Sequence, residues 1–579
     1  DAVAEEYDVD TGRERLSGAT DPDAEAVAPL PFEQLDVLAD ADRERAARKR
    51  DLEIPSTRDA REELRNAIFR EVRAGNTTVL DAPTALGKSH TVATEPWRRQ
   101  ESATGGAPVV HLHATPDARD EALAATRDSA ATGAVLRGRK EASPLARGDY
   151  DPAPEADADP DPVVTIDGEP ASEWFDRQCD AKGLPFSTAL AIARNRNDQG
   201  LDELPPFGEE DPAVAQWDGL PRDDDGEAAV DVLHATHQFA HVPSLRTHTN
   251  VVIDEQPDFT ADVGQERIRR MVNAYLRAID APVSTFGAFT TLARGGMGGD
   301  AGKEADRVDE LLDADHDLGA EWFIDERDAH ALAPDLTRAL WKALRFEESD
   351  ANGRRGTKVW HEPPRFDADE EHYNAGAWLS VVADDENTVR QVRSTPDFSH
   401  ARSVIGLDAH PSMPLWQLNA APGMTRDDVL DATERRLWRR YERGLTVVQV
   451  GDATRPRSGS KALEWMNDER VRAVVERLRE EYGSGFKTAL ATAQTEASVR
   501  SIIGEVAPDV DAENTMHFGE EKSRNDFADE DAGYVYGCMD PGDDMVLDAI
   551  AELGLDATPE RAETDAGETV RAKGRGFVG

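Results

Sequence analysis

Cysteine is almost absent from this chain of 579 residues, which contains only Cys179 and Cys538. Two thiolates cannot complete a four-cysteine zinc site or bind an iron–sulfur cluster alone, and they provide no disulfide framework. Apolar runs of 18 residues are also absent, which excludes a transmembrane helix. The first ten residues lack the basic and apolar regions of a secretory signal. These absences predict a cytoplasmic protein without membrane contact.

Basic residues are outnumbered, because 66 Lys and Arg face 116 Asp and Glu and leave a net charge of −50. Only 11 of the basic residues are lysine, and the carboxylates are spread along the whole chain. This composition resembles that of proteins from salt-in halophiles. In molar salt the Debye length is about 3 Å, so the negative charge does not exclude a nucleic-acid partner.

Alternating strand and helix patterns predict an α/β fold with parallel sheets. A Pro/Asp-rich stretch after residue 149 and a long helical region after residue 262 interrupt the pattern, so we expect two α/β domains, the first with two mainly helical insertions. The expected segments are an acidic N-terminal segment (1–56), a first domain in three parts (57–148, 231–262 and 401–432), an insertion (149–230), a helical insertion (263–400) and a second domain (433–579).

A phosphate-binding loop is predicted where Ala82-Pro-Thr-Ala-Leu-Gly-Lys-Ser follows one predicted strand and opens a helix. In such a loop, backbone N–H groups cradle a phosphate, the lysine reaches the β/γ oxygens and the hydroxyl ligates Mg²⁺. The alternative is an ordinary strand–turn–helix connection, since Ala82 occupies the place of the usual first glycine. The expected ATP-binding residues are Ala82, Pro83, Thr84, Ala85, Leu86, Gly87, Lys88, Ser89 and His90.

A partner for this loop is predicted at Asp254 and Glu255, which end the apolar strand Val251-Val-Ile. Carboxylates at that edge of a parallel sheet lie where Mg²⁺ is held, so we expect Asp254 and Ser89 to be its ligands. Glu255 is expected to orient or deprotonate the attacking water, and with Lys88 and Asp254 it forms the predicted catalytic set. The alternative is a strand that ends in a solvated acidic turn.

With these motifs the sequence resembles the superfamily 2 helicases, specifically their xeroderma-pigmentosum-D and DinG branch, in a haloarchaeal form. The resemblance extends to the segments 235–245, 403–411, 486–493 and 519–541. It implies two RecA-like domains that bind ATP and Mg²⁺ between them, and an arch-like insertion after Asp254. The residues that it places on nucleic acid, or between nucleic acid and ATP, are Thr115, Asp408, His410, Thr492, Ser523, Asn525 and Asp526. Arg119 is a further candidate, and Thr115 fits a simple helix cap equally well.

Several positions depart from the pattern of that branch. Pro257 replaces the histidine of the DEAH box, and Asp408-Ala-His410 replaces Ser/Thr-Ala-Thr. The cysteines of the iron–sulfur module are missing. No arginine-finger motif precedes Gly579, so we expect the chain to be a truncated form.

The sequence therefore predicts an ATP-dependent nucleic-acid motor, a DNA helicase or translocase that acts on single-stranded DNA. An alternative is a nucleotide-dependent switch that remodels a protein complex without unwinding, which Pro257 and His410 favour. A third possibility is a packaging motor with a nuclease site among the aspartates of 540–548. The histidines at 234, 237, 241 and 248 are irregularly spaced and accompanied by no cysteine, so we interpret them as loop residues and not as metal ligands. The basic, aromatic segment 435–443 could be a stacking and phosphate-binding surface, but we favour a helix with Leu437, Trp438 and Tyr441 packed inward and solvated arginines.

Overall fold

The chain divides into two compact units, each described here by itself. The larger unit comprises Arg61–Val429 and Asp544–Gly579, and the smaller comprises Asp1–Ala60 and Leu430–Asp543. A computed structural model describes residues 54–151, 163–196, 211–217, 219–222, 229–295, 301–314, 316, 318–350, 352–364, 376–448, 450, 462–520, 530–537, 542–556, 558–559, 561–563, 569–571 and 577–578.

A seven-stranded sheet forms the centre of the larger unit, in the order β12-β1-β11-β7-β2-β6-β3, and its pairings are all parallel. Its strands are β1 (Thr77–Asp81), β2 (Val109–His113), β3 (Gly133–Val135), β6 (Val232–Thr236), β7 (Asn250–Asp254), β11 (Ser403–Asp408) and β12 (Thr425–Asp428). A second parallel sheet lies in the smaller unit. The α/β class with parallel sheets is therefore confirmed.

The central strands are buried on both faces, which explains their continuous apolar sequences. On β2 the two faces differ in chemistry. Val110 and Leu112 belong to an apolar core that includes Trp416, whereas His111 and His113 alternate with them and point to the opposite face. Helices α5 (Lys88–Thr94) and α7 (Pro116–Arg127) cover that opposite face, since Thr126 of α7 contacts His234 of the sheet.

Strand β11 lies between β1 and β7, although it comes from beyond both insertions. Thr77 pairs with Val404, and Asn250 pairs with Ser403. The carboxyl ends of β1, β11 and β7 therefore lie side by side, at Asp81, Asp408 and Asp254. The remaining elements that flank the sheet are α4 (Thr57–Ala74), η2 (Trp97–Gln100), α6 (Glu101–Thr104), η5 (His237–His241), η6 (Pro243–Leu245) and α18 (Met413–Asn419).

The first insertion forms a small core of its own around Trp174 and Phe175, which also includes Phe323 from the second insertion. Lys182 donates from its buried ammonium to the main-chain oxygens of Phe323, Ile324 and Glu326, and so joins the two insertions. The described elements directly before and within the first insertion are α8 (Arg139–Ala142), α9 (Pro144–Arg147), β4 (Thr165–Ile166), β5 (Glu169–Pro170), α10 (Ala171–Phe175), the π-helix η3 (Asp176–Ala181), α11 (Phe186–Arg196) and α12 (Pro212–Ala215).

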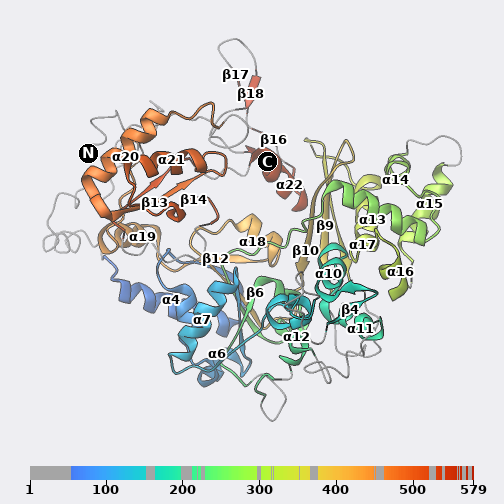
Figure 1. The fold of residues 1–579 in the computed structure, drawn as a ribbon, viewed down its shortest axis with the longest axis horizontal. Coiled ribbons are helices and arrows are strands. Elements are labelled where there is room, and N and C mark those ends of the chain that lie inside the picture. The colour runs from blue at the N-terminus through green and yellow to red at the C-terminus, as the bar shows by residue number, and fades with distance from the viewer. Residues whose placement is uncertain are drawn as a thin grey trace. The chain divides into compact units, whose positions relative to one another are not determined.

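The described residues of the second insertion form five helices and a three-stranded antiparallel sheet, β10-β9-β8, which was not expected from the sequence (Figure 1). The helices are α13 (Gln265–Ala278), α14 (Phe286–Ala293), α15 (Ala301–Leu312), α16 (Ala320–Asp325) and α17 (Ala333–Arg345). The strands are β8 (Arg354–His361), β9 (Ala377–Asp384) and β10 (Val389–Pro396). Helices and sheet share one apolar core, and Trp341 is among its fully buried side chains.

Charged side chains attach this antiparallel sheet to the C-terminal part of α22 (Gly542–Glu552). Arg393 of β10 donates from Nε to Glu552 over 3.0 Å, and Arg354 of β8 pairs with Asp548 over 2.9 Å. Glu552 also accepts a hydrogen bond from Ser380 of β9. Because these ionic residues occupy strand positions that would otherwise be apolar, the strands lack the hydrophobic alternation by which a sequence reveals them.

The smaller unit contains the parallel sheet β14-β13-β15 with α20 and α21 packed on it through Val475, Val499 and Ile503. Its described elements are α19 (Ala432–Leu437), the π-helix η8 (Trp438–Glu442), α20 (Asp468–Tyr482), η9 (Gly483–Gly485), β13 (Phe486–Ala491), α21 (Glu496–Val506), η10 (Ala512–Asn514), β14 (Thr515–His517) and β15 (Ala532–Val535). Trp438 is 1% exposed, which confirms its inward packing.

The last part of the larger unit adds the short strands β16 (Thr558–Pro559), β17 (Arg561–Glu563), β18 (Thr569–Arg571) and β19 (Phe577–Val578). Among the described residues, no helix has the length and apolar character needed to cross a membrane.

Candidate functional site

The loop between β1 and α5 has the conformation of a tight turn that brings several main-chain groups to the edge of the sheet. Gly87 has a φ of 85° and Ala85 a φ of 64°, so two residues of the loop lie in the left-handed region. A glycine adopts that region without steric cost, which explains Gly87 directly before the helix. The N–H of Ala82 donates to Asp408 O over 2.8 Å, and this bond fixes the start of the loop to β11.

Helix α4 supports the far end of the same loop. Arg61 donates from Nε to the main-chain oxygen of Leu86 over 3.1 Å, and Leu86 itself is fully buried. The helical ladder begins at once beyond it, because the N–H of Thr91 donates to Gly87 O over 2.9 Å. The loop is therefore held at both ends by neighbours outside it.

Lys88 and Ser89 open α5, and their side chains leave the loop in different directions. Lys88 Nζ lies 3.4 Å from Ala82 O, so the ammonium folds back over the loop. Ser89 Oγ donates a short hydrogen bond to Asp254 Oδ2. The two motifs predicted far apart in the sequence thus meet, with a hydroxyl and a carboxylate in direct contact.

Asp254 ends β7 and is buried, with 8% of its surface exposed. This burial raises the pKa of its carboxyl to about 6, although the hydrogen bond from Ser89 and the charge of Lys88 act in the opposite direction. The neighbouring carboxylates Glu255 and Asp408 raise the pKa further. One ammonium group and two further carboxylates therefore act on the charge of Asp254 at this edge of the sheet.

Glu255 leaves the strand with a φ of 64°, a region that a non-glycine residue rarely occupies. Its N–H donates to Leu407 O over 2.9 Å, which extends the β7–β11 pairing by one residue. The turn redirects the chain immediately after the sheet, so Glu255 is partly exposed while Asp254 is buried.

Asp408 ends β11 next to the loop, and its carboxylate binds within its own segment. One oxygen accepts from the N–H of exposed His410 over 3.0 Å, and the other accepts from the indole N–H of Trp416 over 2.8 Å. The main-chain oxygen of Asp408 is the acceptor for Ala82 described above. Asp408 therefore joins the loop between β1 and α5 to the segment that carries His410.

A hard cation of the Mg²⁺ type fits this arrangement. Ser89 Oγ and Asp254 Oδ2 are the oxygen ligands that Mg²⁺ prefers, and they are already adjacent. The raised pKa of Asp254 shows that its buried negative charge lacks sufficient compensation from Lys88 and Ser89. A divalent ion at these two oxygens would supply that compensation.

Other predicted residues lie elsewhere or have structural partners. Thr115 is the N-cap of α7 and accepts from the N–H of Ala118 over 3.2 Å, so the structure gives it the capping role. Arg119 was expected to contact nucleic acid, but its side chain is fully buried and pairs with Glu141 at 2.7 Å. That prediction is wrong because a guanidinium sequestered by a carboxylate cannot reach a phosphate.

In the smaller unit, Thr492 follows β13, is 7% exposed and lies 2.9 Å from the hydroxyl of Thr495. The predicted residues Ser523, Asn525 and Asp526 lie outside the described residues.

The nuclease alternative also loses a candidate, because Asp548 is buried and pairs with Arg354 and Arg390.

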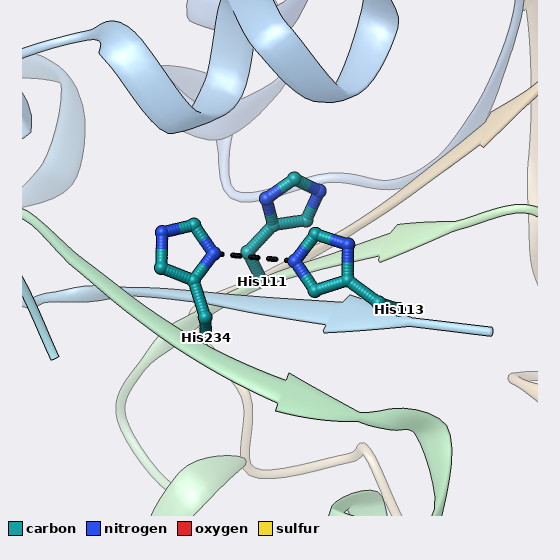
Figure 2. A group of neighbouring side chains, drawn as sticks. All are labelled: His111, His113 and His234. Carbon is teal, nitrogen blue, oxygen red and sulfur yellow. Dashed lines mark hydrogen bonds between the residues drawn. The ribbon is translucent and has the colours of Figure 1, made fainter. Parts of the chain in front are cut away.

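Sequence reasoning missed a group of histidines behind Asp254. His111 and His113 of β2 and His234 of β6 lie together on one face of the sheet (Figure 2). Further toward the site, the His237 ring lies 2.9 Å from Asp254 O. The interpretation of His234 as a loop residue is wrong, because it is a fully buried strand residue. The alternation of His111 and His113 with the apolar residues Val110 and Leu112 was the one available signal.

No protein-family profile and no curated protein matches the chain. Among solved structures, the chain is similar to one titled "XPD_Helicase", with 12% identity, a TM-score of 0.36 and coverage of 86% of this chain and 88% of that one. It is also similar to "Structure of S. tokodaii Xpd4", with 11% identity, a TM-score of 0.32 and coverage of 85% and 86%. At these low values, the function has to be inferred from the residues of the site.

Proposed function

We propose that this protein is an ATP-dependent nucleic-acid motor, a DNA helicase or translocase that acts on single-stranded DNA. The observation that carries the ATPase part is the convergence of Lys88, Ser89 and Asp254 at one sheet edge, with Ser89 bonded to Asp254. An ammonium, a hydroxyl and a carboxylate at the end of a strand–loop–helix unit are the groups that hold a nucleoside triphosphate with its metal ion.

In this proposal each residue has a distinct role. Lys88 turns from Ala82 O to the phosphate oxygens, while Ser89 and Asp254 hold Mg²⁺. Mg²⁺ held by these two residues would supply neutralisation of negative charge on the phosphates. Glu255, placed beside Asp254 by its left-handed backbone, accepts a proton from the attacking water or orients it.

The nucleic-acid part rests on the resemblance of the segments at 403–411, 486–493 and 519–541 to helicase motifs. One physical link supports it, since the loop N–H of Ala82 is bonded to Asp408 O. A change in the loop on nucleotide binding is thereby passed to the Asp408–His410 segment. In a motor, that segment transmits the nucleotide state to the strand contacts.

One observation favours a second candidate, a nucleotide-dependent switch without unwinding activity. The Asp408 carboxylate already binds His410 N–H and the Trp416 indole, so this segment is committed to internal contacts. Pro257 has neither a side-chain donor nor a backbone N–H with which to connect the nucleotide site to a bound strand.

ATP turnover with and without single-stranded DNA distinguishes the two candidates. The assay uses the longest available reading frame in molar KCl, where repulsion between the acidic surface and phosphate is screened. We expect DNA to stimulate turnover, and we expect Lys88→Ala to lower it by roughly 10²–10³-fold, because a charge that stabilises the transition state is lost. Lys303→Ala, on the exposed face of α15, is the matched control and should turn over normally.

Loss of turnover in Lys88→Ala without any response to DNA would favour the switch. Turnover that survives in Lys88→Ala would contradict the nucleotide site itself.

A further inference from the structure

Three histidines from two neighbouring strands form a buried group that the proposed ATPase chemistry does not use. His111 and His113 lie two residues apart on β2, and His111 is the register partner of His234 on β6. All three are fully buried beneath α5 and α7. Figure 2 shows the three rings as neighbours, with a hydrogen bond that runs directly between His113 and His234 and the His111 ring beside it.

The spacing of their ring nitrogens suits a single metal ion. One nitrogen from each residue can be chosen so that all three lie within 4.8 Å of one another. His113 Nε2 and His234 Nδ1 are 3.2 Å apart. Two nitrogens that bind one tetrahedral zinc ion at about 2.0–2.1 Å are separated by roughly 3.3 Å, so this pair needs almost no movement.

Hydrogen bonding leaves the group incomplete without a further partner. Neither ring nitrogen of His111 has a hydrogen-bond partner among the described residues, and the same holds for His113 Nδ1. Buried polar atoms are almost always paired, and each exception requires an explanation. A lone pair on His111 that meets no donor is available to a cation.

The outer partner of His234 fixes which nitrogen faces the group. Thr126 Oγ1 lies 2.8 Å from Ala93 O and 3.0 Å from Ala122 O. Because carbonyl oxygens only accept, the Thr126 hydroxyl donates its hydrogen to one of them. Thr126 Oγ1 therefore accepts from the Nε2–H of His234 over 2.9 Å. That bond leaves His234 Nδ1 unprotonated and directed at His113, as is usual for metal-binding histidines held by an outer-shell acceptor.

The carboxylate of Asp254 lies on the Nδ1 side of the His113 ring. His113 Nδ1 lies 3.9 Å from Asp254 Oδ2. Without a metal, His113 must donate from Nε2 to His234, which leaves an unprotonated Nδ1 facing that carboxylate. With a metal on Nε2, the proton moves to Nδ1 and the two groups become complementary.

All three imidazoles are in the form that binds metals. Burial lowers the pKa of His113 to about 2 and of His234 to about 4, and it lowers that of His111 well below its usual value. Neutral imidazole is the ligand form, so no proton has to leave the group at neutral pH, and only the proton of His113 shifts from Nε2 to Nδ1.

We propose that His111, His113 and His234 form a binding site for one divalent transition-metal ion of the zinc type, which joins β2 to β6. Three nitrogen ligands select such an ion over Mg²⁺, which prefers oxygen. Three protein ligands leave one position of the tetrahedron for a water molecule. The site uses other ligand atoms than the oxygen site of Ser89 and Asp254, which it adjoins at His113, and it does not depend on the proposed ATPase function.

Metal analysis of the full, untagged chain tests the site. The protein is purified in millimolar Mg²⁺, which saturates oxygen sites, and its zinc is measured by mass spectrometry. We expect about one zinc ion per chain. Reconstitution of unfolded protein with Co²⁺ should give the intense visible bands of a tetrahedral ion with nitrogen ligands, a readout independent of activity.

Two ligand variants and two controls make the result specific. His111→Leu should fold, because it replaces a side chain whose nitrogens have no partners, and His234→Asn keeps a polar group beside Thr126. Each variant should contain at most about one tenth of the zinc that the parent chain contains. His400→Gln, at an exposed histidine, and Ser89→Ala, at the oxygen site, should retain it fully.

Two results would overturn the proposal. The first is a parent chain that carries only background zinc and shows no Co²⁺ bands, which would identify a metal-free histidine cluster. The second is zinc that persists in both His111→Leu and His234→Asn, which would place the ion elsewhere.

Discussion

Asp254 combines two properties that oppose each other, because the carboxylate proposed to bind the metal is also unfavourably buried. Its pKa is raised from 3.8 to about 6, mainly by burial. The folded protein therefore holds a proton between these pH values that the unfolded chain has already released. Stability falls as the pH rises through this window, and the full penalty is present above pH 6.

Asp254→Asn should consequently stabilise the metal-free protein while it abolishes ATP turnover. The pKa shift corresponds to about 3 kcal/mol at pH 7.5, and the gain should vanish near pH 4, where the native carboxyl is neutral. Urea unfolding in EDTA, followed by tryptophan fluorescence at both pH values, measures it. Glu304→Gln removes an exposed carboxylate from α15 and serves as the control. An equal gain at both pH values would contradict burial as the cause.

At the scale of elements, β11 determines whether the site can form. It lies between β1 and β7, and its Gly406 faces Val79 and the Trp416 ring. A Cβ built on Gly406 would lie 2.4 Å from Val79 Cγ2 and 2.7 Å from the Trp416 ring. Trp416 also holds Asp408 through its indole N–H, so the packing of this glycine and the position of Asp408 are connected.

Gly406→Ala should therefore lower the free energy of unfolding by about 1–3 kcal/mol through overpacking. It should also reduce ATP turnover, because displacement of Trp416 disturbs the segment bonded to the loop. Gly302→Ala, at an open position of α15, is the control and should be neutral or slightly stabilising. Denaturant unfolding of both variants measures this difference in the free energy of unfolding. Equal stability of the two would show that β11 has room for a side chain at residue 406.

The sequence was informative about these strands because their apolar runs are continuous: the predicted strand Val251-Val-Ile lies within β7, and the segment 403–411 contains β11. It also predicted that Ser89 and Asp254 share a sheet edge, and the structure brings them into contact. Their catalytic and metal-binding roles stay predictions.

The antiparallel sheet was missed because its strands bury charges that depend on partners distant in sequence, such as Arg393 with Glu552. The histidine group was missed for a related reason. His111 and His234 meet only through strand register, which no local spacing reveals.

At the scale of the whole molecule, a net charge of −50 means that folding gathers carboxylates that repel one another. Many of the arginines form ion pairs with nearby carboxylates, such as Arg65 with Glu95 and Arg426 with Asp81. These pairs leave the excess of acidic over basic residues uncompensated. The folded state should therefore depend on screening by salt.

We expect the thermal midpoint to rise by several degrees between about 0.1 and 1 M KCl, as the Debye length falls from about 10 to 3 Å. Each kcal/mol added to the free energy of unfolding raises the thermal midpoint by about 2–4 °C for a domain of roughly 150–250 residues. Circular dichroism measures the midpoint, and sucrose at matched osmolality separates screening from exclusion of solute. A midpoint that does not change with KCl would show that repulsion is already balanced.

The position of β11 also has a consequence for synthesis on the ribosome. Both neighbours of β1, namely β11 and β12, are encoded after the two insertions. At about 5–20 residues per second, roughly 15–65 s pass between translation of Asp81 and of Ser403. During this interval β1 has no strand with which to pair. The loop that carries Lys88 and Ser89 therefore leaves the ribosome well before its strand β1 can enter the sheet.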